Sequence, residues 1–263
     1  SVPLAAWIRD SFKDEFSTLS SKELISNVNK GEPVIKSNFI KNKKADKVMM
    51  KFIDENKISI PVRLHDFKNI RQRFGSRFFE LHLSYDEIKT LIKDKKYISD
   101  NIFKNDVISI HLPDYIDKDN LIDPFSKNSF IKNESVFHIK TSIAKACEIE
   151  KLTGNKVVIV GSFSVGGKNK KLFYERLSEM IKDYKKSSGI QIVAQWLPKQ
   201  AWYFGGSAIL DVFCSPDDIK SVKEFSIPIC LDISHLILSA NYFEEDWEKW
   251  YKQLYPLQKH IHL

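Results

Sequence analysis

The sequence predicts an α/β fold in which strands and helices alternate as in a (β/α)8 barrel. From residue 58 onward, short β-rich runs alternate with helical stretches, a rhythm typical of βα units around a parallel sheet. More than six such units follow one another without a break. No GxGxxG motif follows the first strand, so a closed barrel is favoured over an open doubly wound sheet.

Seven strands are expected, and a complete barrel needs eight. We therefore expect a barrel that is truncated near its seventh strand and incomplete at the C-terminus. Its two unpaired sheet edges would favour association into a homo-oligomer. The predicted strands are Ile58 to His65, Phe78 to Leu83, Val107 to Leu112, Lys156 to Ser164, Ile190 to Leu197, Ile227 to Ile233, and a seventh that begins at Lys259.

The stretches between the strands carry apolar stripes at a spacing near 3.6 residues, which predicts helices packed on the sheet. Two helix starts are also marked. Ser84 precedes an acidic first turn, and Ser215 precedes Pro216, which suits the first position of a helix. The stripes are Val136, Ile139, Ile143 and Cys147; Phe173, Leu177, Met180, Ile181 and Tyr184; and Trp247, Trp250, Tyr251 and Leu254.

Residues 1–45 lack the βα rhythm and contain a turn-forming NKGEP segment, so we interpret them as a small separate β-rich module and linker. Residues 46–263 form the barrel, and residues 45–57 are predicted to be a helix that leads into it. Both ends of the sequence resemble fragment boundaries.

Composition and charge narrow the class of protein. The 263 residues carry a formal charge of +7, which brings nucleic acid into consideration, but the lysines are scattered and are typical of solvated faces. Three cysteines without a CxxC motif favour a reduced, cytoplasmic protein. No apolar stretch reaches the roughly 20 residues that cross a bilayer, so no membrane partner is expected.

Ionisable residues share one register of several strands, opposite a run of aliphatic residues. Aliphatic side chains suit the face that helices cover, so the ionisable ones are expected to project into the barrel. There they would meet near its C-terminal mouth, where barrel enzymes keep their active sites. These residues are Arg63 and His65, Glu80 and His82, His111, Asp232, and His260 and His262.

Such a convergence allows two kinds of chemistry. Histidines and carboxylates could hold a divalent metal, or they could form a hydrogen-bonded acid/base cluster without one. Asp232 and His235 in the LDISH segment are the stronger signal, whereas a lone histidine such as His111 or His138 is more often a satisfied structural residue. Burying several charges without a purpose would cost several kcal/mol for each unpaired group.

Two loops after the fourth and fifth strands are expected to line the same mouth. The glycines of residues 161–167 could bind an anionic group through their amides, or simply turn the chain. The rings of Trp196 and Trp202 suit the apolar face of a sugar, or the protein core.

The segments FFELHL, ISIHLPDY, CLDISH and HIHL are similar to those of the xylose isomerase-like TIM barrels, a family of sugar-phosphate isomerases and epimerases that includes endonuclease IV-type repair enzymes. A more particular resemblance is to polypeptides of the N-acetylneuraminate (sialic acid) synthase family. In those, a synthase barrel and a small SAF (antifreeze-like) domain precede this barrel. PVRLHDF, FFELHLSY, WYFGG and CLDISH resemble their barrel, and ELISNVNKGEPVIKSNFI resembles the end of an SAF domain.

The resemblance implies a barrel that acts on a sugar of sialic or nonulosonic acid biosynthesis, covalently linked to an upstream synthase domain. It implies a bound Mn, Mg or Zn ion, although Gln195 stands where the family has a metal-binding glutamate. Two alternatives remain open: a non-catalytic barrel that binds a sugar or docks the synthase domain, and an endonuclease IV-like repair enzyme. The expected roles are catalytic for Glu80, His111 and Asp232; substrate-binding for Arg63, His65, His82, Gln195 and Trp202; and metal-binding for Asp232, His235 and His262.

Overall fold

The computed structural model describes residue 55 and residues 57–262. The predicted N-terminal module of residues 1–45, and nearly all of the helix predicted over residues 45–57, lie outside the described residues.

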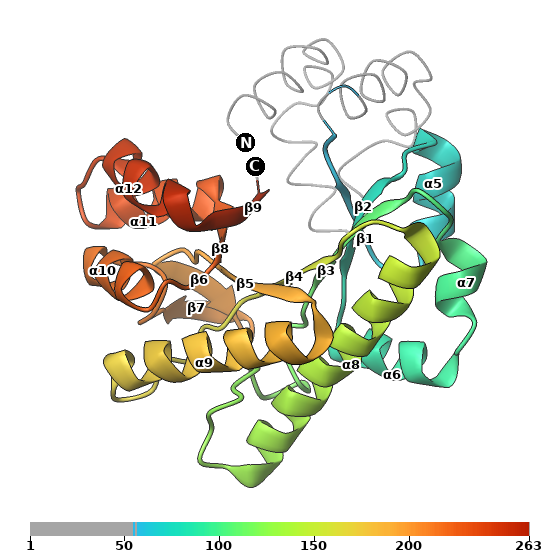
Figure 1. Ribbon diagram of the computed structural model, residues 1–263. Coiled ribbons are helices and arrows are strands. Elements are labelled where there is room, and N and C mark those ends of the chain that lie inside the picture. Colours follow the sequence, from blue (N-terminus) through green and yellow to red (C-terminus); the bar gives the residue numbers. More distant parts are fainter. Residues whose placement is uncertain (1–54, 56, 263) are drawn as a thin grey trace, which may run out of the picture.

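Within the described residues, seven strands form one parallel sheet that curves as part of a barrel (Figure 1). The order β1-β2-β3-β4-β5-β8-β9 follows the chain, and every neighbouring pair is parallel. The incomplete (β/α) barrel predicted from the strand rhythm is thus confirmed. The strands are β1 (Ile60–Val62), β2 (Phe78–His82), β3 (Val107–His111), β4 (Val158–Gly161), β5 (Gln191–Gln195), β8 (Ile229–Asp232) and β9 (Gln258–His262).

An antiparallel hairpin follows β5, where the sequence predicted only a loop. Its strands are β6 (Gln200–Tyr203) and β7 (Gly206–Ile209). The two residues between them, Phe204 and Gly205, have φ angles of 53° and 75°. Positive φ at both central positions matches the tight turn that joins twisted hairpin strands.

Helices cover the outer face of the curved sheet (Figure 1). Their apolar stripes pack on the strands as the 3.6-residue spacing predicted. They are α5 (Phe67–Phe74), α6 (Tyr85–Lys93), α7 (Tyr97–Asn101), α8 (Ser129–Thr153), α9 (Lys170–Ser188), α10 (Pro216–Glu224), α11 (Ile233–Tyr242) and α12 (Trp247–Leu254), with a 3-10 turn, η2 (Tyr255–Leu257), before β9.

Both predicted helix starts are confirmed. The Ser84 hydroxyl accepts a hydrogen bond from the Glu87 amide, and the Glu87 carboxylate accepts one from the Ser84 amide, which completes a capping box at α6. At α10, the Ser215 hydroxyl accepts from the Asp218 amide, and Pro216 occupies the first turn.

The two faces of the sheet differ as the strand registers predicted. Phe79, Leu81 and Ile110 are buried against the helices in the large core, where Trp196 and Trp250 also meet edge to face. On the interior face, Val160, Val193 and Cys230 form a small separate apolar cluster. Polar residues of the same face lie beside this cluster, since Val160 pairs with His111, and Cys230 pairs with Gln195 and His260.

None of the helices in the described region is long and apolar enough to cross a membrane. Cys147, Cys214 and Cys230 are all free thiols, and the last two are buried.

Candidate functional site

The buried carboxylate of Glu80 is the centre of the polar cluster inside the sheet. Only 4% of this β2 residue is exposed. Its oxygens lie 2.6 Å from Nε2 of His82, 2.9 Å from Nε2 of His260 and 3.0 Å from Nε2 of His262, and they accept a 2.9 Å hydrogen bond from the Ser109 hydroxyl. Three imidazoles and one hydroxyl therefore surround a single carboxylate.

Parallel strand pairing brings these residues together. Glu80 pairs with Ser109 in the β2–β3 register, so their side chains point to the same face. His260 and His262 lie two residues apart on β9, which also places both side chains on one face. The curvature of the sheet then carries β9 across the interior toward β2.

Electrostatics keep this cluster ionised. Burial raises the pKa of Glu80, but hydrogen bonds from His260, His262 and His82 outweigh burial and hold the pKa well below its usual range. Burial lowers the pKa of His262, but its contacts with Asp232, Cys230 and Glu80 raise it to about 12. At neutral pH, a carboxylate and an imidazolium therefore stabilise each other in the interior.

The Gln195 amide connects this cluster to the rest of the site. Its Oε1 accepts hydrogen bonds from the Ser162 hydroxyl at 2.7 Å and from Nε2 of His111 at 3.0 Å. Its Nε2 donates to Oδ2 of Asp232 at 3.0 Å and lies 3.2 Å from Nδ1 of His262. Both ends of the amide are thus occupied by neighbours from four other strands or strand ends.

His111 faces two acceptors. Its Nε2 meets Gln195 Oε1, and its Nδ1 lies 2.8 Å from the Leu112 carbonyl oxygen. A neutral imidazole carries only one N–H, so these contacts favour the protonated ring. Burial acts in the opposite direction and is the larger effect, so the pKa of His111 is lowered. An imidazole whose pKa is shifted by burial and that lies at a cavity is typical of acid/base sites.

Asp232 ends β8 and caps α11. Its Oδ1 accepts a 2.9 Å hydrogen bond from the His235 amide, while its Oδ2 lies 3.3 Å from Nδ1 of His235. Burial raises the pKa of Asp232, but the neighbouring His262 and His235 together lower it by more, so the net pKa is below its usual value. His235 Nδ1 also lies 3.1 Å from the Trp196 carbonyl oxygen. Both carboxylate oxygens of Asp232 are therefore engaged by protein groups.

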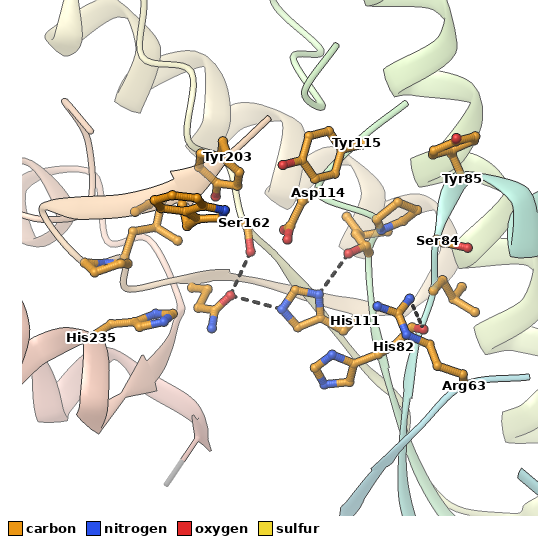
Figure 2. A pocket seen from close by; sticks show the side chains of 18 of the residues that line it. Arg63, His82, Ser84, Tyr85, His111, Asp114, Tyr115, Ser162, Tyr203 and His235 are labelled. Carbon is orange, nitrogen blue, oxygen red and sulfur yellow. Dashed lines mark hydrogen bonds between the residues drawn. The ribbon is translucent and has the colours of Figure 1, made fainter. Parts of the chain in front are cut away.

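A cavity of about 490 Å³ opens above the cluster, at the carboxyl ends of the strands (Figure 2). His82, His111 and Gln195 reach its wall from the cluster, and Arg63 and His235 line it on either side. Trp202, on β6, also lines it with 72% of its surface exposed. The other lining residues include Ser84, Tyr85, Asp114, Tyr115, Ser162, Tyr203 and Leu238.

Not every predicted site residue joins the cavity. The His65 side chain is 79% exposed, lies 4.0 Å from the Glu87 carboxylate, and does not line the cavity. Trp196 is fully buried in the core, so its ring is not available to a sugar. Gly166 and Gly167 line a second cavity of about 450 Å³ with Lys127 and Phe173, outside the main one.

Within residues 57–262, the compact group that could hold a metal consists of Glu80, His260 and His262, whose ligand atoms all lie within 4.8 Å of one another. It shares only His262 with the predicted set of Asp232, His235 and His262. Two imidazoles and a carboxylate suit zinc or manganese better than magnesium, which prefers oxygen ligands. The donor set therefore fits a divalent cation.

Sequence reasoning did not assign roles to His260, Ser109, Ser162 or Asp114. His260 carried a signal, since it shares a strand face with His262, but the HxH pattern did not indicate that both rings reach one carboxylate. Serines within or just after strands, and an aspartate after a strand, are too common to single out.

No protein-family model and no curated protein matches the sequence. Among solved structures, a D-tagatose 3-epimerase-like protein shares 15% identity over 78% of this chain and 76% of its own, with a TM-score of 0.47. The 3-keto-D-glucoside 4-epimerase YcjR from E. coli shares 14% identity over 76% of this chain and 72% of its own, also with a TM-score of 0.47. SacUVDE shares 17% identity over 74% of this chain and 63% of its own, with a TM-score of 0.41. These are distant similarities in chain arrangement.

Proposed function

We propose that this chain is a carbohydrate-processing enzyme of the isomerase or epimerase type, which moves a proton on a sugar held in the main cavity. The observation that carries the proposal is the ionised Glu80, held by three histidines directly beneath a cavity whose wall includes His82 and His111. Titratable groups whose pKa values are shifted by burial and charge, and which lie at a cavity, are typical of proton-transfer sites.

His111 is the proposed acid/base group, because its ring reaches the cavity wall. Burial lowers its pKa, although its two acceptors favour the protonated ring. His82 stacks on His111 with ring centroids 4.6 Å apart and links it to Glu80. The nearby charges of Asp114 and Glu80 would stabilise a proton taken up at His111, whereas His82 opposes it.

A small polar substrate fits the cavity. Its volume of about 490 Å³ falls within the range of small-molecule sites. Arg63 at one side would bind an anionic group, such as a phosphate or carboxylate on the sugar. Trp202 would cover an apolar sugar face.

A divalent cation, if bound by Glu80, His260 and His262, would supply positive charge that polarises a sugar carbonyl or hydroxyl group. Without it, the same residues form the hydrogen-bonded cluster described above. Gln195 and Asp232 would position the imidazoles in either case.

The finer proposal is that the substrate is an intermediate of sialic or nonulosonic acid biosynthesis, and that a synthase domain is linked upstream. It is supported by the resemblance of PVRLHDF, WYFGG and CLDISH to the barrel of such polypeptides. Assays should therefore include N-acetylated amino sugars as well as simple hexoses and their phosphates.

The test is proton exchange on a sugar in D2O. Protein stripped with EDTA, or reloaded with Mn or Zn, is incubated with hexoses, hexose phosphates and N-acetylhexosamines, and deuterium uptake next to the carbonyl is followed by NMR. We expect uptake by the wild type and at least a hundredfold loss in Glu80→Gln and His111→Asn, with Glu179→Gln on the exposed face of α9 as the matched control. Absence of exchange on every sugar, with and without metal, would defeat the proposal.

A second candidate function is a barrel that binds a sugar without transforming it. The amide of Gln195 favours it, because an amide binds a divalent cation more weakly than a carboxylate and its two ends are already engaged. Sugar binding by calorimetry without any isotope exchange would support this alternative.

A further inference from the structure

The second cavity, of about 450 Å³, lies between the loop that precedes α8 and the first two turns of α9. Among the described residues, none lines both this cavity and the main one. One side of α9 and its N-cap line it at the i, i+3, i+4, i+7 spacing of a helix face, with Asn169, Leu172, Phe173 and Arg176. Residues 123 and 125–127 line it from the loop, and residues 165–168 complete the wall between β4 and α9. Its volume falls within the range of small-molecule sites.

Three cationic side chains line this cavity, those of Lys127, Lys168 and Arg176. The neighbouring Lys170 and Lys171 form salt bridges with carboxylates of α10, at 3.4 Å and 2.9 Å. Within residues 57–262, by contrast, the three cavity cations form no salt bridge. Positive charges gathered without counter-charges repel one another, and a bound anion would relieve that repulsion.

Asp123 is the acidic residue of the described lining, and the loop itself engages its carboxylate. Its Oδ1 accepts a 3.0 Å hydrogen bond from the Phe125 amide, and burial raises its pKa above the ordinary value. The Asp123 amide donates a 2.8 Å hydrogen bond to the Ser135 hydroxyl, which fixes the loop to α8. Three cations against one carboxylate leave the lining with a net charge of +2. The cavity therefore favours an anion over a cation.

The cavity also offers apolar surface. The rings of Phe125 and Phe173 meet edge to face, with their centroids 6.0 Å apart, and Phe173 is buried. Leu172 lines the same cavity with 38% of its surface exposed, so the protein leaves part of a hydrophobic side chain uncovered there. An inorganic anion would use the cations alone, whereas an anion that carries an aromatic group would also cover this apolar surface.

We propose that the second cavity binds a phosphate ester that carries an aromatic group, such as an aryl phosphate or a nucleotide. The phosphate would meet the three cations, and the ring would cover Leu172 and the edge-to-face aromatic pair. The Arg176 guanidinium would engage two phosphate oxygens at once, and the two lysines would add point charges. The site goes beyond the proposed sugar chemistry and does not depend on it, because the two cavities have different linings.

Calorimetry with phenyl phosphate, AMP and inorganic phosphate tests the site. We expect the wild type to bind the two aromatic esters at least tenfold more tightly than inorganic phosphate. The double variant Lys168→Gln/Arg176→Gln should bind the esters at least tenfold more weakly than the wild type, because it lacks two of the charges that hold the phosphate. Both positions are exposed, so its urea unfolding should match that of the wild type. Lys182→Gln/Lys186→Gln is the matched control, since it removes two exposed charges of α9 outside the cavity lining.

Arg63→Gln separates this site from the main cavity, where Arg63 is the expected anion-binding residue. We expect it to leave the binding of phenyl phosphate unchanged. Loss of binding in Arg63→Gln but not in Lys168→Gln/Arg176→Gln would place the ester in the main cavity and overturn the proposal. Equal weakening in the two double variants of α9 would indicate attraction to diffuse positive charge and would also overturn it. The proposal fails as well if the wild type binds neither ester, or binds inorganic phosphate as tightly as the esters.

Discussion

The carboxylate of Glu80 on β2 and the imidazole of His262 on β9 lie 3.0 Å apart, although 182 residues separate them in the sequence. The contact crosses the interior of the curved sheet and joins its second strand to its last described one. Each group offsets part of the burial of the other: His262 lowers the pKa of Glu80, after His260, and Glu80 raises the pKa of His262, after Asp232 and Cys230. The pair therefore has consequences for folding as well as for the site.

Replacing Glu80 with glutamine should destabilise the protein strongly. The change removes one of the two carboxylates that contact His262 and leaves only Asp232, and breaking a buried ion pair typically costs about 3–5 kcal/mol. Urea unfolding of Glu80→Gln, His262→Gln and the double variant would measure the coupling, which we expect to exceed about 1.5 kcal/mol. His65→Gln, at an exposed position, is the control. Additive effects of the two substitutions would mean that the contact contributes nothing.

Gln195→Glu tests whether the amide keeps the site from binding metal. A carboxylate at this position would face Oδ2 of Asp232, which now accepts a 3.0 Å hydrogen bond from the amide. We expect the EDTA-treated variant to be less stable than the wild type by about 2 kcal/mol, because two like charges would adjoin in a buried site. Added Mn or Zn should restore that stability and bind at least tenfold more tightly than to the wild type.

Thermal unfolding with and without metal, together with metal analysis of the purified proteins, provides the measurement. Gln72→Glu on the exposed face of α5 is the control. A variant that is destabilised but gains no metal affinity would show that Gln195 has a structural role only.

The strand rhythm was sufficient to predict the sheet because each strand buries one aliphatic register against helices. The same alternation placed Glu80, His111, Asp232 and His262 on the opposite face, where the structure brings them into one network. Period-two patterning is a local property, so it determines which way a side chain points.

Contacts between distant strands could not be predicted in the same way. Which imidazole reaches Glu80 depends on the curvature of the sheet and on a register irregularity between β8 and β9 at Cys230. Trp196 and Trp202 were equivalent in the sequence, yet one is in the core and the other is on a hairpin. The φ angles of Phe204 and Gly205 produce that hairpin, and only the glycine indicated a turn.

His138 should make the protein less stable in mild acid. This α8 residue is 1% exposed, and no described group bonds its Nδ1. Its pKa is lowered to about 4, mainly by burial and to a smaller extent by the nearby Lys89, with Asp117 opposing both. Below the ordinary value of 6.5, the unfolded chain binds a proton that the folded protein does not. Stability is therefore lost as the pH falls from about 6.5 toward 4.

Between pH 7 and pH 5 this loss should amount to about 2 kcal/mol. Urea unfolding at the two pH values would measure it, and His138→Leu should remove that part of the pH dependence while His65→Gln leaves it unchanged. Identical pH dependence in the wild type and His138→Leu would assign the acid sensitivity to other groups.

Trp202 should contribute to ligand binding without contributing to stability. Its ring lines the cavity but remains 72% exposed, so Trp202→Ala removes little buried surface and should change the free energy of unfolding by less than about 0.5 kcal/mol. Loss of an aromatic face against a sugar typically costs about 1 kcal/mol, which corresponds to roughly fivefold weaker binding. Calorimetry with the sugar identified in the exchange assay would measure the change.

Phe130→Ala is the matched control, since Phe130 is also an exposed aromatic residue but lies at the start of α8, outside the cavity lining. Equal affinities for all three proteins would show that the ring does not contact the ligand. A large loss of stability in Trp202→Ala would instead mean that the ring holds the hairpin in place, and that the cavity depends on it only indirectly.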